Sequence, residues 1–309
     1  MIGGLSPSNE QFLASMNILE NTLNQANEQL ASGLKVNQAS DAPQSLQDIF
    51  VTRAELGQAN QAVQNLTTIQ GQVQAASGSV QSAIQLLNQA VALGTEGAST
   101  STSLATQQNL AQQVQGLLAQ LVATANTDVG GVYVFSGDQT GSAPYKVDTS
   151  SPTGVDQLIT PQQATLQVQG PSGVRYQVSM TAQELFDQQD SGGNPTTNNA
   201  FAALTNLVQA LESGNATNIT QAISNVQAAG NHVNSQTGFY GEAENNISSA
   251  LDLARKYATQ DQTQLSSLQD ADTVSLAVEV TQATTALNAA MSAQAHKPTS
   301  TLFDYLPIP

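Results

Sequence analysis

The sequence predicts a mainly α protein in which long helices from both chain ends form an elongated bundle or coiled coil, with a small β-rich domain inserted between them. Three observations lead to this fold class. Apolar residues alternate at spacings of four and three near the N-terminus and again near the C-terminus, which is typical of one face of an α-helix. Between these regions, residues 166–180 alternate with a period of two, as in a β-strand.

The two terminal stripes cannot be buried by residues close to them in sequence, so we expect them to pair with each other. The N-terminal stripe consists of Phe12, Met16, Leu19, Leu23, Ala26 and Leu30. The C-terminal stripe consists of Leu276, Val280, Ala283, Leu287 and Ala290. Each stripe is typical of a helix face that packs against a second helix, and the two stripes lie at opposite ends of the chain.

A break and two further helices follow the N-terminal stripe. Gly33 and Pro43 interrupt the helical pattern, and Ser40 or Asp41 before Pro43 is a helix start signal, because proline is tolerated in a first turn. We expect a long helix over residues 44–93 and a turn over 94–103. The long helix has seam positions Val63, Leu66, Gln70, Val73, Ser77, Val80, Ile84, Leu87 and Val91. A third helix, marked by Leu110, Val114, Leu117 and Leu121, should end near Asn126.

The pattern changes at Gly130, and we expect a β-rich domain over residues 130–198. Its predicted strands are Val132–Phe135, a strand around Leu166 and Val168, and Val174–Met180. Helical spacing returns at Phe201 and continues, after a turn at Gly214, from Ile219 to Ala254 with an expected kink. Glycines at 230, 238 and 241 predict that kink, since glycine costs about 1 kcal/mol relative to alanine in a helix.

Composition excludes several function classes. Seven Lys and Arg against 23 Asp and Glu give a formal net charge of -16, which argues against binding to nucleic acid phosphates or to anionic lipid. No apolar run approaches the roughly 18 residues of a membrane-spanning helix, and the N-terminus shows no signal-peptide pattern. The absence of cysteine excludes disulfides and thiolate chemistry.

No residue pattern indicates catalysis, a cofactor or a metal site. The two histidines, His232 and His296, lie far apart in sequence without a ligand pattern, so we expect solvated or structural roles for them. Asp270 and Asp272 stand two residues apart and would point in different directions on a helix, which favours helix capping or a solvated face. We therefore predict a protein that is not an enzyme, with no cofactor and no metal.

Two segments resemble the flagellin family. The first is ASGLKVNQASDAP at residues 31–43, similar to the family's loop after its first helix, and the second is LQDADTVSLAVEVTQATTALNAAMSAQA at residues 268–295. The segment at 31–43 is equally compatible with a simple connector, whose Gly, Asn, Ser and Pro only turn the chain. The family resemblance implies instead a loop that faces other subunits in an assembly.

Within the family, the sequence is most similar to the hook-filament junction subfamily of hook-associated proteins. This similarity lies in NTDVGGVYVFSGDQTGSAPY at residues 126–145 and in TLFDYL at 301–306. The sequence departs from the usual family pattern in having no cation before Lys35. The resemblance implies an extracellular structural subunit of the bacterial flagellum, exported without a cleaved signal peptide, that joins hook and filament.

The resemblance also implies the partners and the domain roles. Its partners would be further copies of itself, other hook-associated proteins, flagellin, the flagellar export apparatus and, as a candidate, an export chaperone, but no nucleic acid and no membrane. Residues 1–43 and 262–309 would form a terminal helical assembly domain, poorly ordered until assembly. Residues 44–129 and 199–261 would form a long-helix core, and residues 130–198 an outward-facing β-rich domain.

The candidate assembly interface combines both terminal stripes with the C-terminal tail. Its residues are Phe12, Met16, Leu19, Leu23, Leu30, Leu276, Val280, Leu287 and Leu302. Two alternatives remain open at this point. One is the flagellin filament subunit itself, and the other is a non-flagellar extended helical interaction protein or adhesin.

Overall fold

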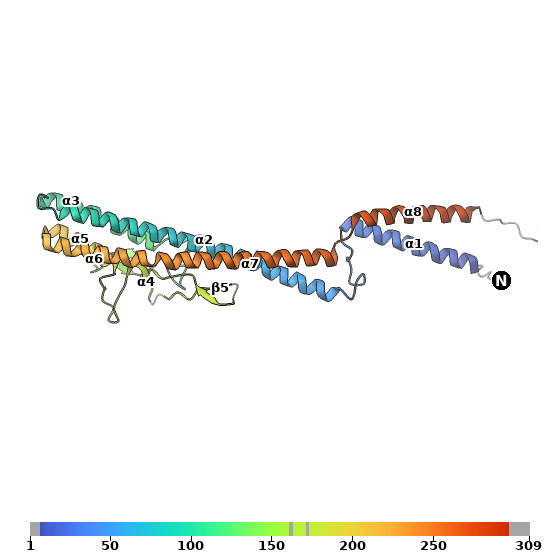
Figure 1. Cartoon of the computed structure of the whole chain (residues 1–309), viewed down its shortest axis with the longest axis horizontal. Coiled ribbons are helices and arrows are strands. Elements are labelled where there is room, and N and C mark those ends of the chain that lie inside the picture. Colours follow the sequence, from blue (N-terminus) through green and yellow to red (C-terminus); the bar gives the residue numbers. More distant parts are fainter. Residues whose placement is uncertain (1–6, 161–162, 171–172, 297–309) are drawn as a thin grey trace, which may run out of the picture. The chain divides into compact units, whose positions relative to one another are not determined.

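The computed structural model describes residues 7–160, 163–170 and 173–296 (Figure 1). The described helices are α1 (Pro7–Ser32), α2 (Leu46–Gly97), α3 (Leu104–Ala125), α4 (Ala182–Phe186), α5 (Ala200–Ser213), α6 (Ala216–Ser235), α7 (Thr237–Gln269) and α8 (Thr273–Ala295). Short strands lie between α3 and α4. This confirms the predicted mainly α fold with a small β-rich region. Of the helices in this part of the chain, none is long and apolar enough to span a membrane.

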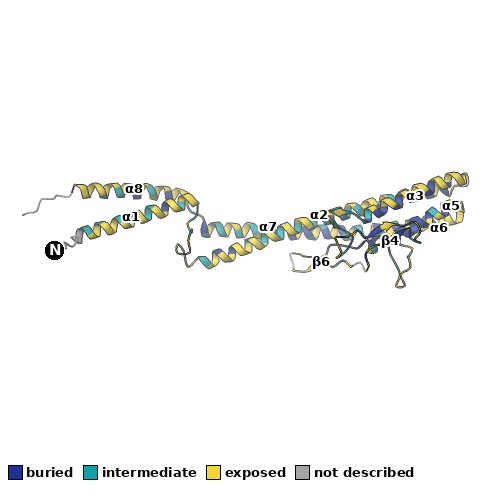
Figure 2. Ribbon diagram, turned by 180° about the vertical axis from the view of Figure 1, so that it is seen from behind, coloured by how far each residue is buried: buried dark blue, intermediate teal, exposed yellow. Residues whose placement is uncertain are grey.

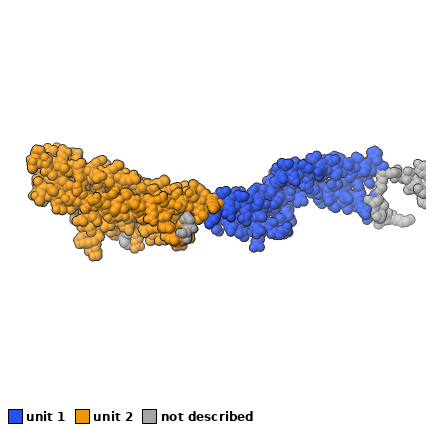
Figure 3. All heavy atoms as spheres, viewed as in Figure 1, with its two compact units in different colours: residues 1–58, 257–309 blue, residues 59–256 orange. Residues whose placement is uncertain are grey.

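The chain divides into two compact units, which Figure 3 shows in different colours. The first unit contains residues 1–58 and 257–309, and the second contains residues 59–256. Helices α2 and α7 contribute residues to both units. The predicted division into three domains is finer than this one and stays a prediction.

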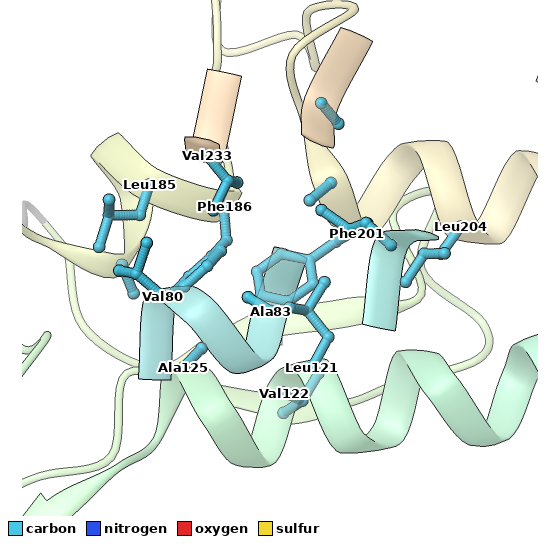
Figure 4. Close-up of a cluster of buried hydrophobic side chains, with 14 of the residues drawn as sticks. Val80, Ala83, Leu121, Val122, Ala125, Leu185, Phe186, Phe201, Leu204 and Val233 are labelled. Atoms are coloured by element: carbon cyan, nitrogen blue, oxygen red, sulfur yellow. The ribbon is translucent and has the colours of Figure 1, made fainter. Parts of the chain in front are cut away.

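The second unit is held together by helices that pack around one apolar cluster. Helix α3 packs against α5, and α5 packs against α6. Figure 4 shows the centre of the cluster, where Leu121 from α3, Phe186 from α4 and Phe201 from α5 point toward one another. The Phe135 and Phe186 rings meet edge to face with centroids 5.7 Å apart, a favourable aromatic geometry.

Helix α2 enters this cluster through small residues. Its fully buried positions recur at spacings of three and four, and every second one is alanine or glycine: Val73, Ala76, Val80, Ala83, Leu87, Ala90, Gly94 and Gly97. At Gly94, an added Cβ would lie 2.8 Å from Ile223 Cγ1, and at Gly97 it would overlap with Leu211 Cδ2. The buried stripe therefore coincides with the predicted seam at Val73, Val80 and Leu87. At the alternate positions the prediction was one residue off: Ala76, Ala83 and Ala90 are buried, whereas the predicted Ser77, Ile84 and Val91 are only partly buried.

The β-rich region consists of three two-stranded antiparallel hairpins in the described residues. Strand β1 (Asp128–Val129) pairs with β2 (Val132–Tyr133), β3 (Tyr145–Val147) pairs with β4 (Val155–Gln157), and β5 (Gln167–Gln169) pairs with β6 (Arg175–Gln177). Gly130 and Gly131 join the first pair with φ values of 63° and 85°, as a two-residue hairpin of type I′ requires.

The structure corrects three predicted elements. The strand expected over Val132–Phe135 ends at Tyr133, because the Phe135 side chain leaves the hairpin and is buried against Phe186. The single helix expected from Ile219 to Ala254 is divided at Gln236 into α6 and α7. This break lies within the region where glycines predicted a kink. Helix α2 begins at Leu46, three residues after the expected start at Pro43.

A buried polar network ties the β-rich region to the helices. The Asp187 carboxylate accepts hydrogen bonds from Tyr145 Oη at 2.9 Å, Asn199 Nδ2 at 2.6 Å and Gln189 Nε2 at 2.9 Å. Asn199 also caps α5 through its side-chain oxygen, and Asn126, which caps α3, binds the Tyr145 backbone in both directions. Hydrogen bonds between buried polar side chains thus fix strand β3 to the ends of two helices, α3 and α5.

Replacing Gly97 with alanine should destabilise the second unit. Leu211 is completely buried and cannot move away from the added methyl group, so we expect Gly97→Ala to lower the free energy of unfolding by about 1–3 kcal/mol. The measurement is urea unfolding followed by circular dichroism. Gly78→Ala in the same helix is the control, since nothing lies within 4 Å of its added Cβ, and it should raise stability by about 0.5–1 kcal/mol. Equal effects at both sites would refute the close-approach argument.

The pKa of Asp187 provides a second test. Burial raises the pKa of this carboxyl above its ordinary value of 3.8, and the hydrogen bonds from Asn199, Tyr145 and Gln189 oppose the rise. Because the folded protein favours the protonated form, the stability contributed by this group is complete below pH 3.8 and is lost as the pH rises through the raised folded pKa.

Asparagine at position 187 does not titrate. The difference in unfolding free energy between the native chain and Asp187→Asn should therefore shrink as the pH is raised from below 3.8 to neutrality. Urea titrations at a series of pH values measure this difference. A difference that grows toward neutral pH would show that the hydrogen bonds outweigh burial.

Candidate functional site: the paired terminal helices

The two terminal helices meet in the first unit, where α1 packs against α8 (Figure 1). Helix α1 ends at Ser32 and α8 begins at Thr273, beside the same joint, so the two helices run antiparallel. This is the helix pairing that the two apolar stripes predicted. It forms within one chain, from residues more than two hundred positions apart.

The seam between α1 and α8 is narrow. Ala26, Leu276 and Ala283 are buried, whereas most other seam residues are half-buried. The half-buried candidates are Phe12, Met16, Leu19, Leu23, Val280 and Leu287. Leu30 is 39% exposed, and Leu302 lies outside the described residues. The structure thus brings eight of the nine candidate residues onto one helix pair, and their role in assembly stays a prediction.

A large part of the apolar surface on this pair remains uncovered. Figure 2 shows that exposed residues dominate both helices, in contrast to α5 and α6 in the second unit. The exposed large apolar side chains on α1 and α8 are Leu13, Ile18, Leu30, Val274, Val278 and Met291. Val274 is 74% exposed and Ile18 is 67% exposed. The pair therefore carries exposed apolar side chains in addition to those in its seam.

The joint between the terminal helices and α2 and α7 is closed by backbone hydrogen bonds. Leu34 and Asp270 form an antiparallel bridge, in which the Lys35 amide donates to the Gln269 carbonyl at 2.8 Å and the Ala271 amide donates to the Gly33 carbonyl at 2.9 Å. The connector after α1 is thereby fixed to the connector before α8. This joint is the site of the segment that resembles the flagellin loop.

Side chains from both helix connections reinforce the joint. Lys35 Nζ donates to the Ser267 carbonyl at 2.8 Å, and Arg53 Nη2 donates to Gln269 Oε1 at 2.8 Å. The Asp41 carboxylate accepts from two backbone amides of its own loop, at Asn37 and Gln38, which closes the turn before α2. The loop therefore acts as a shaped connector within the chain, whatever it contacts in an assembly.

The remaining candidate residues have local structural contacts. Asp272 is the N-cap of α8 and accepts from the amides of Val274 and Ser275 at 3.0 and 3.1 Å, which agrees with the predicted capping role. His232 Nε2 lies 2.9 Å from the Glu184 carbonyl oxygen, and His296 Nδ1 lies 2.8 Å from that of Ser292. Within the described ranges, no group of three or more Asp, Glu or His side chains could hold a metal ion.

The second unit contains an apolar cleft that sequence reasoning did not find. A cleft of about 200 Å³ has an apolar floor made by Val73, Ala76 and Val178, with Tyr240 beside them. Burial raises the pKa of Tyr240, so its hydroxyl stays protonated at neutral pH. Asp138, at the rim, accepts hydrogen bonds from the Thr165 amide and hydroxyl at 3.0 Å. An apolar floor, a protonated tyrosine and a hydrogen-bonded rim carboxylate do not form the acid–base pair that proton-transfer catalysis uses.

Gly33 offers a test of the joint. Its φ of 72° is left-handed and terminates α1, a conformation that costs a residue with a side chain about 1–2 kcal/mol. Gly33→Ala should therefore lower the hydrogen-exchange protection of α1 amides by about fivefold or more. Gly57→Ala is the matched control, because Gly57 lies inside α2 with no atom within 4 Å of an added Cβ. Unchanged protection in Gly33→Ala would mean that the joint does not support α1.

Comparison with known proteins points to one family. Residues 8–140 match the model of the bacterial flagellin N-terminal helical region. None of the curated protein sequences matches the chain. The family match covers α1, the joint loop, α2, α3 and the first hairpin.

Several solved structures have the same fold. A protein assigned as a flagellar hook-associated protein from Vibrio parahaemolyticus is 16% identical, with a TM-score of 0.63, over 74% of this chain and 100% of that one. Flagellar hook-associated protein 3 from Legionella pneumophila is 13% identical, with a TM-score of 0.58, over 71% of this chain and 98% of that one. The flagellar junction protein FlgL from Legionella pneumophila is 13% identical, with a TM-score of 0.53, over 65% and 99%.

At these identities the likeness establishes a shared fold. The match over residues 8–140 includes the first of the two segments on which the sequence resemblance rested, the loop at 31–43, whereas the second segment, 268–295, lies outside it. Over residues 8–140 the chain is similar to the N-terminal helical region of bacterial flagellin, and as a whole it has the fold of the hook-associated proteins named above.

Proposed function

We propose that the chain is a structural subunit of the bacterial flagellum that acts as an adaptor between hook and filament. The observation that carries the proposal is the α1–α8 pair, which is built from both chain ends and leaves apolar side chains on its outside. Such a pair gains stability from further helices, since each fully buried Leu or Ile contributes about 1.5–3 kcal/mol. The hook-associated proteins and the junction protein with the same fold support this choice of role.

The proposal includes the place of the protein and its partners. It acts outside the cell, after passage through the flagellar export apparatus without a cleaved signal peptide, with an export chaperone as a candidate partner. In the flagellum it contacts further copies of itself, other hook-associated proteins and flagellin. Residues 1–43 and 262–309 form its assembly domain, 44–129 and 199–261 its long-helix core, and 130–198 the part that faces outward.

A structural role also agrees with the chemistry of the described residues. Asp272 caps α8, and the buried Asp187 accepts hydrogen bonds that tie the β-rich region to the helices. We propose that the protein has no enzymatic activity. The filament subunit is the second candidate, because the matching family model is that of flagellin itself.

Electron microscopy of purified hooks incubated with the chain and flagellin separates these two functions. An adaptor should add a short segment to hook ends and allow flagellin to polymerise beyond it. Long filaments formed by the chain alone would instead identify it as a filament subunit. A chain that associates with neither hooks nor flagellin would exclude both roles.

A change in the seam should abolish assembly and leave the second unit intact. Leu276 is 8% exposed, and Leu276→Asp would place a carboxylate between α1 and α8, two helices that contain no lysine or arginine. We expect loss of hook binding, with the urea unfolding midpoint of the second unit unchanged. Leu287→Asp should act in the same way. Ser275→Asp, on an exposed position of α8, is the control and should retain binding.

A further inference from the structure

Helices α5 and α6 of the second unit share a groove that the proposed function does not use. Two hollows, of about 330 and 150 Å³, lie along it, and both are lined by Asn206 and Asn225. Together they fall in the size range of sites for small molecules. The polar residues of the larger hollow are Asn206, Gln209, Ser213, Asn218, Gln221 and Asn225. The smaller hollow adds Thr196, Thr197 and Asn199.

The walls of the groove are two rows of side-chain amides. Both amide residues of α5 and the first three of α6 line it. On each helix these residues recur three or four positions apart, which corresponds to about 4.5–6 Å along the axis and to one helix face. Gly214 ends α5 with a φ of 69°, and α6 begins two residues later and packs against α5. The two rows therefore border one groove.

The floor of the groove is made of small apolar groups. Apart from Pro195, the apolar residues that line the two hollows are alanines, and all of them are buried: Ala202, Ala203, Ala210 and Ala222. Such a floor accepts an apolar group of about the size of a methyl. It offers no pocket for the large aromatic or aliphatic anchors by which protein partners usually bind.

The groove carries no charge, although the chain has a formal net charge of -16. Glu212 is the only Asp, Glu, Lys or Arg of α5 and α6, and it does not line either hollow. The side-chain amides of Asn206, Gln209 and Asn218 form no hydrogen bonds with other described residues. Since a primary amide both donates and accepts, these groups are suited to an uncharged ligand that also does both.

We propose that the groove between α5 and α6 binds a neutral oligosaccharide that carries N-acetyl groups. The sugar hydroxyls and acetamido groups exchange hydrogen bonds with the free amides, and the acetyl methyl groups lie on the alanine floor. The spacing of the amides along each helix is comparable to the length of one sugar ring. The site adds a binding activity to the proposed function and does not depend on it.

The test uses the full chain and two neutral trisaccharides in saturation-transfer difference NMR. Chitotriose consists of three N-acetylglucosamine units, and maltotriose consists of three glucose units without acetyl groups. Chitotriose should bind at least about fivefold more tightly, and its acetyl methyl protons should receive the most saturation. Its affinity should stay the same between about 50 and about 500 mM NaCl, because the groove contains no charge.

Two matched variants test the residues. Asn206→Ala and Asn218→Ala together remove one free amide from each wall and should weaken chitotriose binding by about fivefold or more. Asn231→Ala and Asn234→Ala together remove two exposed amides of α6 outside the groove and should leave binding unchanged. None of the four changes alters the charge, and all four positions are exposed, so circular dichroism should show the native helix content in both variants.

A further pair of probes distinguishes the source of the sugar. In glycans of the bacterial cell wall, every second N-acetylated ring carries a lactyl carboxylate. The groove has no cation among its lining residues, so the disaccharide of N-acetylglucosamine and N-acetylmuramic acid should bind more weakly than chitobiose. Tighter binding of the acidic disaccharide would refute the requirement for a neutral ligand.

Other results would overturn the inference as a whole. They are the absence of saturation transfer to chitotriose, equal affinity for maltotriose, or equal loss of binding in the two double variants. Binding of an uncharged helical peptide rich in alanine and asparagine, which chitotriose fails to displace, would identify the groove as a protein contact. Hook binding is measured separately, so failure of the adaptor role leaves these outcomes unchanged.

Discussion

The pairing of two connecting segments is the constraint on which the first unit depends. The hydrogen bonds between Gly33 and Ala271 and between Lys35 and Gln269 bring the end of α1 and the start of α8 to one point. From that point the two helices run side by side, and their apolar stripes come into register. Without the bridge, a long segment of chain would separate the stripes, and its closure entropy would oppose their pairing.

The second unit depends on a different constraint, which is close approach of helices to α2. Alanine or glycine at positions 76, 83, 90 and 97 recurs every seven residues, beside larger residues at 73, 80 and 87. At Gly97 and at Gly94, the absence of a side chain leaves room for Leu211 of α5 and Ile223 of α6 against the α2 backbone. This contact stabilises the unit through van der Waals attraction and burial of apolar surface rather than through hydrogen bonds.

Helices were predicted correctly from the sequence where an apolar pattern extends over many residues. Prediction failed where small residues form the buried face, or where tertiary contacts rather than alternation bury a strand. The spacing of Phe12 to Leu30 and of Leu276 to Ala290 was sufficient to predict two helices and their pairing. It predicted Val73, Val80 and Leu87 of the α2 stripe correctly but chose Ile84 and Val91 in place of Ala83 and Ala90, because larger apolar residues outweigh alanine in an apolar pattern. The β3–β4 hairpin was missed, since Tyr145 and Val155 are buried through tertiary contacts and not through alternation.

The joint determines how the terminal pair is attached to the rest of its unit. Lys35 donates to the Ser267 carbonyl and Arg53 donates to the Gln269 side chain, so the connector after α1 and the first part of α2 are both bound to the last turn of α7. The backbone bridge at Leu34 and Asp270 adds two more hydrogen bonds at the same place. The directions of α1 and α8 at the joint therefore follow from contacts made by their connectors. The apolar seam determines how the two helices pack beyond it.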